Sequence, residues 1–341
     1  MALSLAGYSD GPCVSEVMSM PIQLKAALLV AAIQLAGMGA IPAQAAAEYP
    51  QIIRIGYQKG NSLVVLKNRG TLEKALATHN VKVVWQEFAF GPPLVEGINS
   101  GDIDIGFVGA TPPVFAQAGA GPDVTYVGYS EPYADNYAIL VPKESTAKSL
   151  ADLRGKRIAV AKGSAGQYLL IAALEQANLK LGDVEEAYLG YSEGRAAFER
   201  GDVAAWVVPD PRLADTEQSS GARPLITARS LPTQYSFYIA PRPFAKRYPQ
   251  TLATVLHELD STEQYAKTHQ QEVAQLLSND TKVPVPVWVQ ALARQPWGVH
   301  FPLTDKVIAA QQQVADTFYR NQLLPKAVHV ADAVVDLEQL Q

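Results

Sequence analysis

The amino-acid sequence predicts an α/β fold of two lobes, each a mainly parallel sheet with helices on both faces. Three observations support this prediction. Strand-like and helix-like hydrophobic patterns alternate along the chain, as they do in βαβ units. The alternation occurs twice, about 100 residues apart, because LVEGINSGDIDIGFVG (94–109) aligns with GRAAFERGDVAAWVVP (194–209). A Lys-Gly pair also follows the first strand of each unit, in GYQKGNS (56–62) and VAKGSAG (160–166).

The first unit contains three expected strands with two expected helices between them. The strands are IIRIGY (52–57), VKVVWQEF (81–88) and IDIGFVG (103–109), and the helices are SLVVLKNRGTLEKAL (62–76) and LVEGINSG (94–101). Gly101 closes the second helix at a position that favours glycine.

The second unit repeats this order. Its strands are RIAVA (157–161), VEEAYLG (184–190) and VAAWVV (203–208), and its helices are GQYLLIAALEQANL (166–179) and EGRAAFERG (193–201). In the first of these helices Leu169, Leu170, Ala173, Leu174 and Ala177 keep helical spacing. The alternative is two generic α/β turns that look alike by chance. The paired Lys-Gly positions, and the Gly-Asp pairs at 101–102 and 201–202, disfavour it.

Two aromatic, strand-like segments connect the units. EPYADNYAILVPKES (131–145) enters the second lobe and TQYSFYIAPRP (233–243) leaves it. Helical patterns follow at 251–269, 271–280 and 305–324, and we expect them to pack back on the first lobe. The sequence thus predicts lobe I at 46–138 plus 240–341 and lobe II at 139–239. Two crossings between lobes predict a hinge and a cleft.

The composition indicates a well-packed globular protein, with 48% hydrophobic and 18% charged residues over 341 positions. A formal net charge of −5 argues against general nucleic-acid binding, which requires a basic face. A local positive site for a small anion is compatible with this charge.

The first 45 residues have the pattern of a secretory signal peptide. Lys25 precedes the apolar run AALLVAAIQLAGMGAI (26–41), and an Ala-x-Ala site follows at 43–45. We expect cleavage after Ala45. The alternative is a retained membrane anchor, for which the apolar run is somewhat short.

Sulfur is confined to this segment. Cys13 is the only cysteine, and Met1, Met18, Met20 and Met38 are the only methionines. The mature chain would therefore have no disulfide, no thiolate nucleophile and no cysteine metal site. An exported protein of this size without disulfides points to a bacterial periplasm.

Three corners combine a strand end with a helix start, at 58–62, 109–113 and 162–167. Ligands of open α/β sheets lie beyond the carboxyl ends of the strands. Helix N-termini there offer unpaired N–H groups and the positive end of the helix dipole, which together bind anions. The alternative is plain helix capping by Asn61 or by the hydroxyls of the same corners.

The predicted ligand-binding residues come from these corners and from the end of the strand at 203–208. They are Gln58, Lys59, Asn61, Ser62, Gly109, Ala110, Thr111, Gly163, Ser164, Ala165, Gly166 and Asp210. Lys59 and Lys162 either add charge or point to water. Asp210 either orients donors, meets a cationic group of the ligand, or is a turn residue before Pro211.

Metal-binding and nucleotide-binding patterns are missing from the sequence. His79, His257, His269, His300 and His329 lack close metal spacing. The sequence contains no G-x-x-x-x-G-K-[ST] and no G-x-G-x-x-G, and G-x-S-x-G spacing occurs at 7–11 and at 190–194. We therefore expect a binding protein rather than an enzyme, with no metal and no cofactor.

Five segments resemble the aliphatic sulfonate-binding proteins of ABC importers. They are IRIGYQKGN (53–61), GATPPVFAQA (109–118), LADLRGKRIAVAKGS (150–164), RAAFERGDVAAWVVPDP (195–211) and QQQVADTFYRNQLLPK (311–326). The likeness covers nearly all of residues 50–330. One departure is Pro209, which stands where the family pattern is close to Trp-Asp-Pro. Arg212 likewise stands where an aromatic residue is expected, so the pocket for the organic tail differs from the family's.

The resemblance implies a type II periplasmic binding protein, with two Rossmann-like α/β lobes joined by a two-segment hinge. Such a receptor is monomeric, closes on R–SO₃⁻ without catalysis and delivers it to an ABC permease in the inner membrane for sulfur acquisition. Taurine-binding and nitrate-binding relatives leave a taurine, nitrate or other oxyanion receptor as an alternative. The ammonium of taurine would need a carboxylate such as Asp210, Glu131 or Asp135. A sulfonate- or sulfinate-acting enzyme of this fold is a weaker alternative, because such desulfinases use a cysteine nucleophile.

Overall fold

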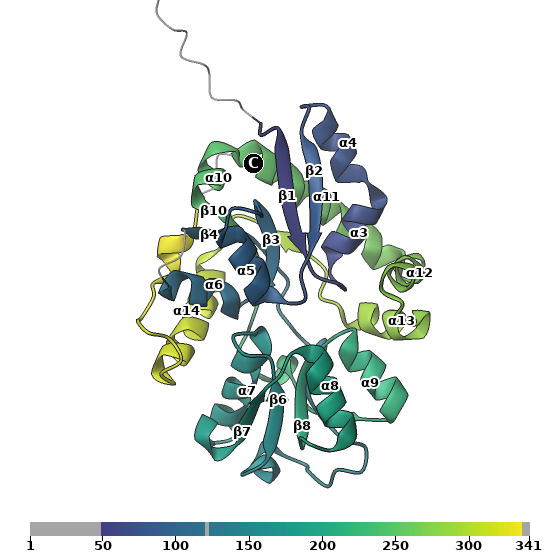
Figure 1. The fold of residues 1–341 in the computed structure, drawn as a ribbon, viewed down its shortest axis with the longest axis vertical. Coiled ribbons are helices and arrows are strands. Elements are labelled where there is room, and N and C mark those ends of the chain that lie inside the picture. Colours follow the sequence, from purple (N-terminus) through teal and green to yellow (C-terminus); the bar gives the residue numbers. More distant parts are fainter. Residues whose placement is uncertain (1–48, 120–122, 336–341) are drawn as a thin grey trace, which may run out of the picture. The chain divides into compact units, whose positions relative to one another are not determined.

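Two β-sheets organise the part of the chain that the computed structural model describes, residues 49–119 and 123–335 (Figure 1). The predicted signal peptide, its cleavage site after Ala45 and all the sulfur-containing residues lie outside these ranges. Within the described ranges, none of the helices has the length and apolar character needed to cross a membrane.

The first sheet has the strand order β11-β4-β10-β3-β1-β2. Its strands are β1 (Ile52–Tyr57), β2 (Lys82–Glu87), β3 (Ile105–Gly109), β4 (Val124–Ser130), β10 (Ser236–Pro241) and β11 (Val299–His300). β1 runs parallel to β2 and β3, whereas β10 runs antiparallel to β3 and β4.

Helices cover both faces of this sheet, which explains the near-continuous apolar runs of its strands. They are α3 (Ser62–Arg69), α4 (Thr71–Ala77), α5 (Gly91–Asn99), α6 (Thr111–Ala118), α10 (Arg242–Arg247), α11 (Pro249–Thr268), α12 (Gln270–Thr281), α13 (Val285–Arg294) and α14 (Asp305–Arg320), with a 3₁₀ turn at Val330–Ala333. One core packs α3, α4 and α11–α13 against the sheet, and a second packs α5, α6 and α14. We call this sheet and these helices the first lobe.

The second sheet has the order β7-β6-β8-β5-β9. Its strands are β5 (Tyr137–Val141), β6 (Arg157–Val160), β7 (Glu185–Tyr188), β8 (Ala205–Pro209) and β9 (Arg223–Thr227). α7 (Ala165–Gln176) packs on one face, and α8 (Tyr191–Arg200) and α9 (Arg212–Ser220) pack on the other. Short 3₁₀ turns lie at Leu150–Leu153, Leu181–Asp183 and Ala228–Ser230. We call this the second lobe.

The predicted two-lobed α/β fold and its internal repeat are confirmed. Both sheets share one order, because β2-β1-β3-β10-β4 in the first corresponds to β7-β6-β8-β5-β9 in the second. Gly101 and Gly201, which follow corresponding helices, have φ angles of 81° and 80°. These are left-handed conformations that glycine adopts without strain.

One expectation about the chain path needs correction. The helix expected at 62–76 is two helices, because Gly70 adopts a φ of 62° and ends α3 before α4 begins. The lobe boundaries expected after residues 138 and 239 would each cut a strand, β5 or β10. The chain passes between the sheets at 131–136 and at 228–235. The division into lobes stays a prediction in its residue bounds.

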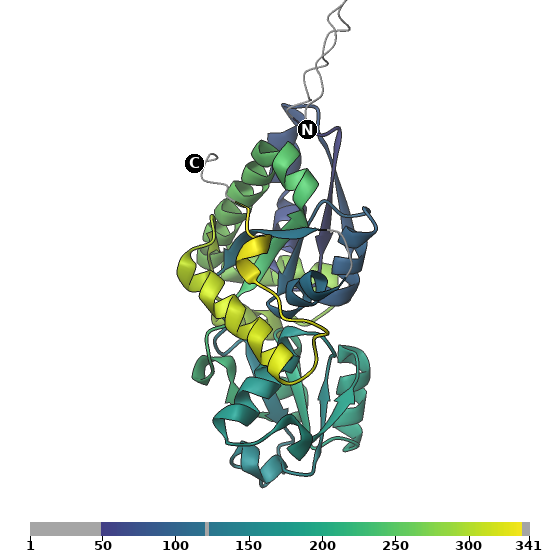
Figure 2. The ribbon, with the colours of Figure 1, turned by 90° about the vertical axis from the view of Figure 1, so that its left-hand side faces the viewer.

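The C-terminal helix also connects the lobes. α14 packs on the first lobe and reaches α7 of the second, as Figure 2 shows. The Arg320 guanidinium lies 3.6 Å from the Glu175 carboxylate of α7, and Asn321 donates a hydrogen bond to the same carboxylate. The late helices therefore do more than pack back on the first lobe.

A buried carboxyl group ties three segments of the first lobe together. Glu263 of α11 is 2% exposed, and its two oxygens accept hydrogen bonds from the Ser62 hydroxyl and from the Gly298 N–H, both at 2.5 Å. Burial raises the pKa of Glu263 to about 7, against the opposing effect of these two hydrogen bonds. The group therefore titrates near neutral pH.

We predict that Glu263→Gln flattens the pH dependence of stability. Since the pKa is higher in the folded chain than in the unfolded chain, the neutral carboxyl favours folding. This contribution is complete below about pH 4, where a free glutamate is protonated, and is lost as the pH rises through about 7. Glutamine can accept from the Gly298 N–H with its oxygen and donate its amide to the Ser62 hydroxyl, without the charge. From pH 5 to pH 8, the free energy of unfolding of the wild type should fall by about 2–3 kcal/mol more than that of the Glu263→Gln variant.

Urea denaturation at the two pH values measures this difference. Glu263→Ala is the control, because it loses the hydrogen bonds and should destabilise the protein at both pH values. Parallel pH profiles of the wild type and Glu263→Gln would show that the carboxyl does not titrate in this range.

Candidate functional site

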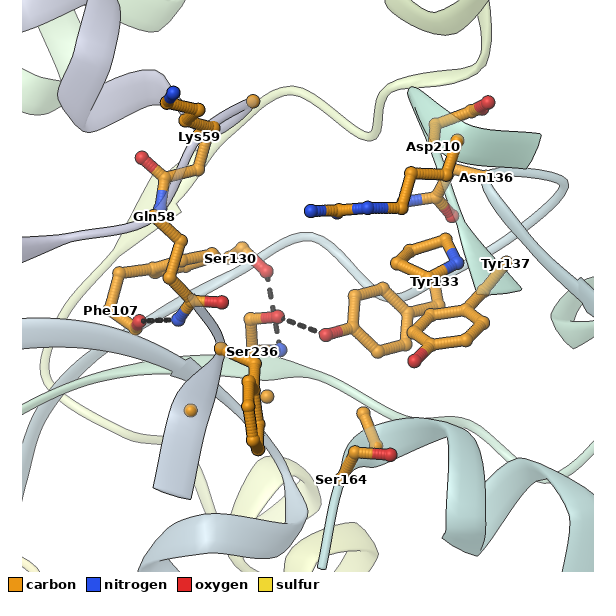
Figure 3. A pocket seen from close by; sticks show the side chains of 18 of the residues that line it. Gln58, Lys59, Phe107, Ser130, Tyr133, Asn136, Tyr137, Ser164, Asp210 and Ser236 are labelled. Atoms are coloured by element: carbon orange, nitrogen blue, oxygen red, sulfur yellow. Dashed lines mark hydrogen bonds between the residues drawn. The ribbon is translucent and has the colours of Figure 1, made fainter. Parts of the chain in front are cut away.

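A cleft lies between the two lobes, where carboxyl ends of strands from both sheets face each other (Figure 3). Its cavity volume is about 130 Å³. Pockets for drug-sized ligands measure roughly 300–1,000 Å³. The cleft therefore suits a compact ligand.

Helix N-termini from both lobes converge on this cleft. The starts of α3, α5 and α6 in the first lobe, and of α7, α8 and α9 in the second, all contribute wall residues. Each start carries N–H groups without an intrahelical acceptor and the positive end of a dipole. The sequence predicted the corners of α3, α6 and α7. The starts of α5, α8 and α9 are additional.

Seven of the predicted site residues line the cleft, namely Gln58, Lys59, Asn61, Gly109, Ser164, Ala165 and Asp210. Some of their side chains are already engaged. The Asn61 side chain accepts a hydrogen bond from Leu63 N–H, and the Ser164 hydroxyl accepts one from Gln167 N–H. Both are N-caps, as the capping alternative proposed. Gln58 donates its amide to the Phe107 carbonyl at 2.9 Å.

The other predicted residues, Ser62, Ala110, Thr111, Gly163 and Gly166, do not line the cleft. The Ser62 hydroxyl is committed to Glu263. Ala110 and Thr111 are fully buried behind the wall. The Gly163 N–H donates to the Gln167 side chain at 2.8 Å, and Gly166 packs beneath Tyr137. A ligand role for these residues stays a prediction.

The cationic side chain best placed in the cleft is Arg212, which the sequence analysis marked only as a departure from the family pattern. Its guanidinium lies 4.8 Å from the centre of the Tyr191 ring. Among the described residues, this guanidinium contacts the Tyr191 ring and has no hydrogen-bond acceptor and no acidic partner. Lys59, by contrast, pairs with Glu87 at 3.4 Å, and Lys162 lies over Tyr188.

Hydroxyl groups form a second set of polar groups in the cleft. The Tyr133 and Ser236 hydroxyls lie 2.5 Å apart, and the Tyr137 and Tyr191 hydroxyls lie 2.9 Å apart. Burial raises the pKa of Tyr133 and Tyr137 above the ordinary value of a tyrosine. These hydroxyls are therefore neutral donors at physiological pH. The sequence analysis did not single out Ser236 or Tyr191, whose places depend on the tertiary fold.

Asp210 is buried beside Arg212, with a side chain 6% exposed. One oxygen accepts from Ala214 N–H at 3.0 Å, and the other lies 3.4 Å from Nε of Arg294 in α13. Burial raises the pKa of Asp210 to about 7, and Arg294 opposes this shift. The carboxylate is turned away from Tyr133 and Tyr137 (Figure 3). Asp210 therefore orients the start of α9.

The arrangement can hold an anion. Amide, hydroxyl and guanidinium donors face a wall that also contains the rings of Phe90 and Phe107. Phe90 packs edge-on against Tyr191, with ring centres 6.4 Å apart. Within residues 49–119 and 123–335, no group of three or more His, Cys, Asp or Glu is placed to hold a metal ion.

Comparisons with known proteins agree with this geometry. A family model described as "ABC transporter, phosphonate, periplasmic substrate-binding protein" matches residues 89–281. An aliphatic sulfonates-binding protein of Escherichia coli (strain K12) is 38% identical over 300 residues, which cover 88% of this chain and 93% of that protein. A Bacillus subtilis (strain 168) protein with the same description is 33% identical over 303 residues, which cover 88% and 90%.

A solved structure has the same fold. The alkanesulfonate-binding protein SsuA from Xanthomonas axonopodis pv. citri, bound to MOPS, superposes with a TM-score of 0.79 at 37% identity. The superposition covers 84% of this chain and 98% of SsuA. By sequence and by structure, the chain belongs to the periplasmic substrate-binding proteins of ABC transporters and, among them, to the aliphatic sulfonate-binding proteins.

Proposed function

We propose that this protein captures aliphatic sulfonates in the cleft between its lobes and delivers them to an ABC permease for sulfur acquisition. The observation that carries the proposal is the unpaired guanidinium of Arg212 at a cleft where helix N-termini from both lobes converge. A sulfonate group is a singly charged, acceptor-only anion. It matches a wall that supplies hydrogen-bond donors and one cationic side chain without an acidic partner.

The same wall favours a monoanion over a dianion. Phosphate-type groups lose a second proton near pH 6 and then carry two charges. A second charge would need a second free cation, and Lys59 is already paired with Glu87.

The organic tail of the ligand would lie against the aromatic part of the wall. The rings of Phe90 and Phe107 line the cleft beside the polar groups. An alkyl chain placed there leaves water at a gain of roughly 25 cal/mol per Å². This arrangement separates recognition of the head group from recognition of the tail.

The two crossings at 131–136 and 228–235 would act as the hinge of this receptor. Closure replaces the water around the anion with fixed donors in a less polar medium, which strengthens each interaction. A monomeric receptor, exported by the predicted signal peptide and released in the periplasm by cleavage after Ala45, completes the proposal.

The taurine alternative has less support from the geometry. Of the carboxylates suggested for an ammonium group, Glu131 lies 2.8 Å from the His300 ring, and Asp135 pairs with Arg229. Asp210 is turned away from the cleft hydroxyls. None of the three is placed to receive the amine.

A phosphonate receptor is the second candidate, because the matching family model carries that description. Phosphonates share the three-oxygen head group and differ in charge. The ligand screen below therefore includes them.

We predict that alkanesulfonates raise the melting temperature of the purified protein and that phosphate, methylphosphonate and taurine do so less. A ligand that binds only the folded state stabilises it by mass action. Thermal shift with ethanesulfonate, hexanesulfonate and these competitors at equal concentration measures the ranking. A larger shift with methylphosphonate than with ethanesulfonate would replace this proposal with a phosphonate receptor.

We predict that Arg212→Gln weakens binding of hexanesulfonate about 10- to 100-fold, because a hydrogen bond to a charged group is worth about 1.5–3 kcal/mol. Isothermal titration calorimetry measures the affinity. Lys59→Gln is the matched control, since it removes one positive charge that is already paired at the cleft, and its affinity should stay within about threefold of the wild type. Equal losses for the two variants would mean that net charge, and not contact with Arg212, sets the affinity.

A further inference from the structure

Gly109 and Ala165 meet across the cleft. Gly109 ends β3 in the first lobe, and Ala165 is the first residue of α7 in the second. A methyl group built on Gly109 would lie 2.7 Å from Cβ of Ala165 and 3.1 Å from the Tyr133 hydroxyl. Real Cβ atoms essentially never approach a neighbour to within 3.0 Å. Any side chain at position 109 would therefore push the second lobe away.

The backbone of Gly109 does not itself require glycine. Its φ lies outside the left-handed region, unlike that of Gly60, whose φ is 93°. Gly60 also approaches the second lobe, because a methyl group added to it would lie 3.0 Å from Cδ of Pro211. The φ of Gly60 would strain any substitution there. Of these two glycines, therefore, only Gly109 allows the contact between the lobes to be tested without adding backbone strain.

The contact lies beside both crossings of the chain. The Ala165 carbonyl accepts a hydrogen bond from Gln234 of the second crossing at 3.1 Å, and this bond is buried. Tyr133 belongs to the first crossing and bonds to Ser236 of β10. A contact so close to the two crossings affects the width of the cleft, because a small separation of the lobes near the crossings becomes a larger separation at the rim of the cleft.

We propose that Gly109 and Ala165 set the separation of the lobes at the base of the cleft, and that this separation determines how tightly the receptor holds a compact sulfonate. The inference rests on the proposed function and deepens it. A methyl group at position 109 requires the lobes to part by roughly 1 Å before the two carbons reach their packing distance of 3.5–4.0 Å. Donors of the second lobe, including Arg212, then move away from an anion held by the first. Hydrogen bonds in proteins have donor–acceptor distances of about 2.7–3.2 Å, so a shift of roughly 1 Å takes such a bond outside its normal range.

Three variants test this proposal, namely Gly109→Ala, Ala165→Gly and the double variant. Isothermal titration calorimetry with ethanesulfonate measures affinity, and thermal unfolding without ligand measures stability. We expect Gly109→Ala to bind at least tenfold more weakly than the wild type while its unliganded melting temperature changes little. In the double variant the added methyl faces a glycine, so its affinity should return to within threefold of that of Ala165→Gly alone.

The double variant distinguishes contact between the lobes from a local effect. If Gly109→Ala binds like the wild type, the proposal fails. If the double variant stays as weak as Gly109→Ala, the methyl acts on its own corner and the proposal fails as well. If the wild type binds no sulfonate, the proposed function fails. A measurement made without ligand then tests whether Gly109 and Ala165 set the separation of the lobes.

That measurement is the distance between spin labels on the two lobes. Glu96 of α5 and Ser192 of α8 are exposed, and labels at Glu96→Cys and Ser192→Cys in a Cys13→Ser background would be the only ones in the chain. Double electron–electron resonance should give a longer distance between the labels in Gly109→Ala than in the parent. The double variant should give the same distance as the parent. An unchanged distance in Gly109→Ala would overturn the inference whatever the ligand.

Discussion

The parallel pairing of β1 with β3, and of β6 with β8, fixes the position of the ligand-binding cleft in this protein. Only two residue pairs define each register, Ile55 with Ile105 and Gly56 with Gly106 in the first sheet, and Ile158 and Ala159 with their partners in β8. Parallel strands end at the same edge of a sheet, and each must be followed by a helix that returns along a face. The helix starts therefore gather at one edge of each lobe, and the two edges face one cleft.

The distribution of charge around the cleft follows from this geometry. Asp210 and Glu217 both lie close to the Arg294 guanidinium, which reaches α9 from α13 of the other lobe. Arg294 is thus the cationic partner of both carboxylates, and Glu87 pairs with Lys59 at the rim. A chain with a net charge of −5 keeps a locally positive cleft because its nearby acidic groups have other partners.

The features that could be read from the sequence are the local ones. A strand followed by small residues and a helix start identified the corners around Gln58, Gly109 and Ser164, because hydrophobic periodicity and capping chemistry are encoded within a few neighbouring residues. The same locality caused the error at 62–76, where the helical pattern continues through Gly70 and hides a left-handed break. α9 was not predicted because RLADTEQSS is mostly polar, although its Leu213 is fully buried.

Partners distant in sequence account for the remaining differences. The Ser62 hydroxyl was expected to face a ligand, but it bonds to Glu263, which is 201 positions away. Arg212 and Tyr191 come together only because α8 and α9 begin at the same edge of the second sheet. Spacing along the chain carries no information about such pairs, so the identity of the charged group in the cleft required the three-dimensional structure.

The strands attached to the crossings lie inside the sheets. β5 has β8 and β9 on its two sides, and β10 has β3 and β4. A force applied through either crossing is therefore shared by hydrogen-bond ladders on both flanks of the strand that receives it. In the receptor proposed above, each lobe would then move as a unit, and the work of closing would fall on the few side chains that meet between the lobes. Ligand preference can then change through substitutions at the helix starts while the mechanics of opening stay the same, which is how one architecture can serve receptors for many different solutes.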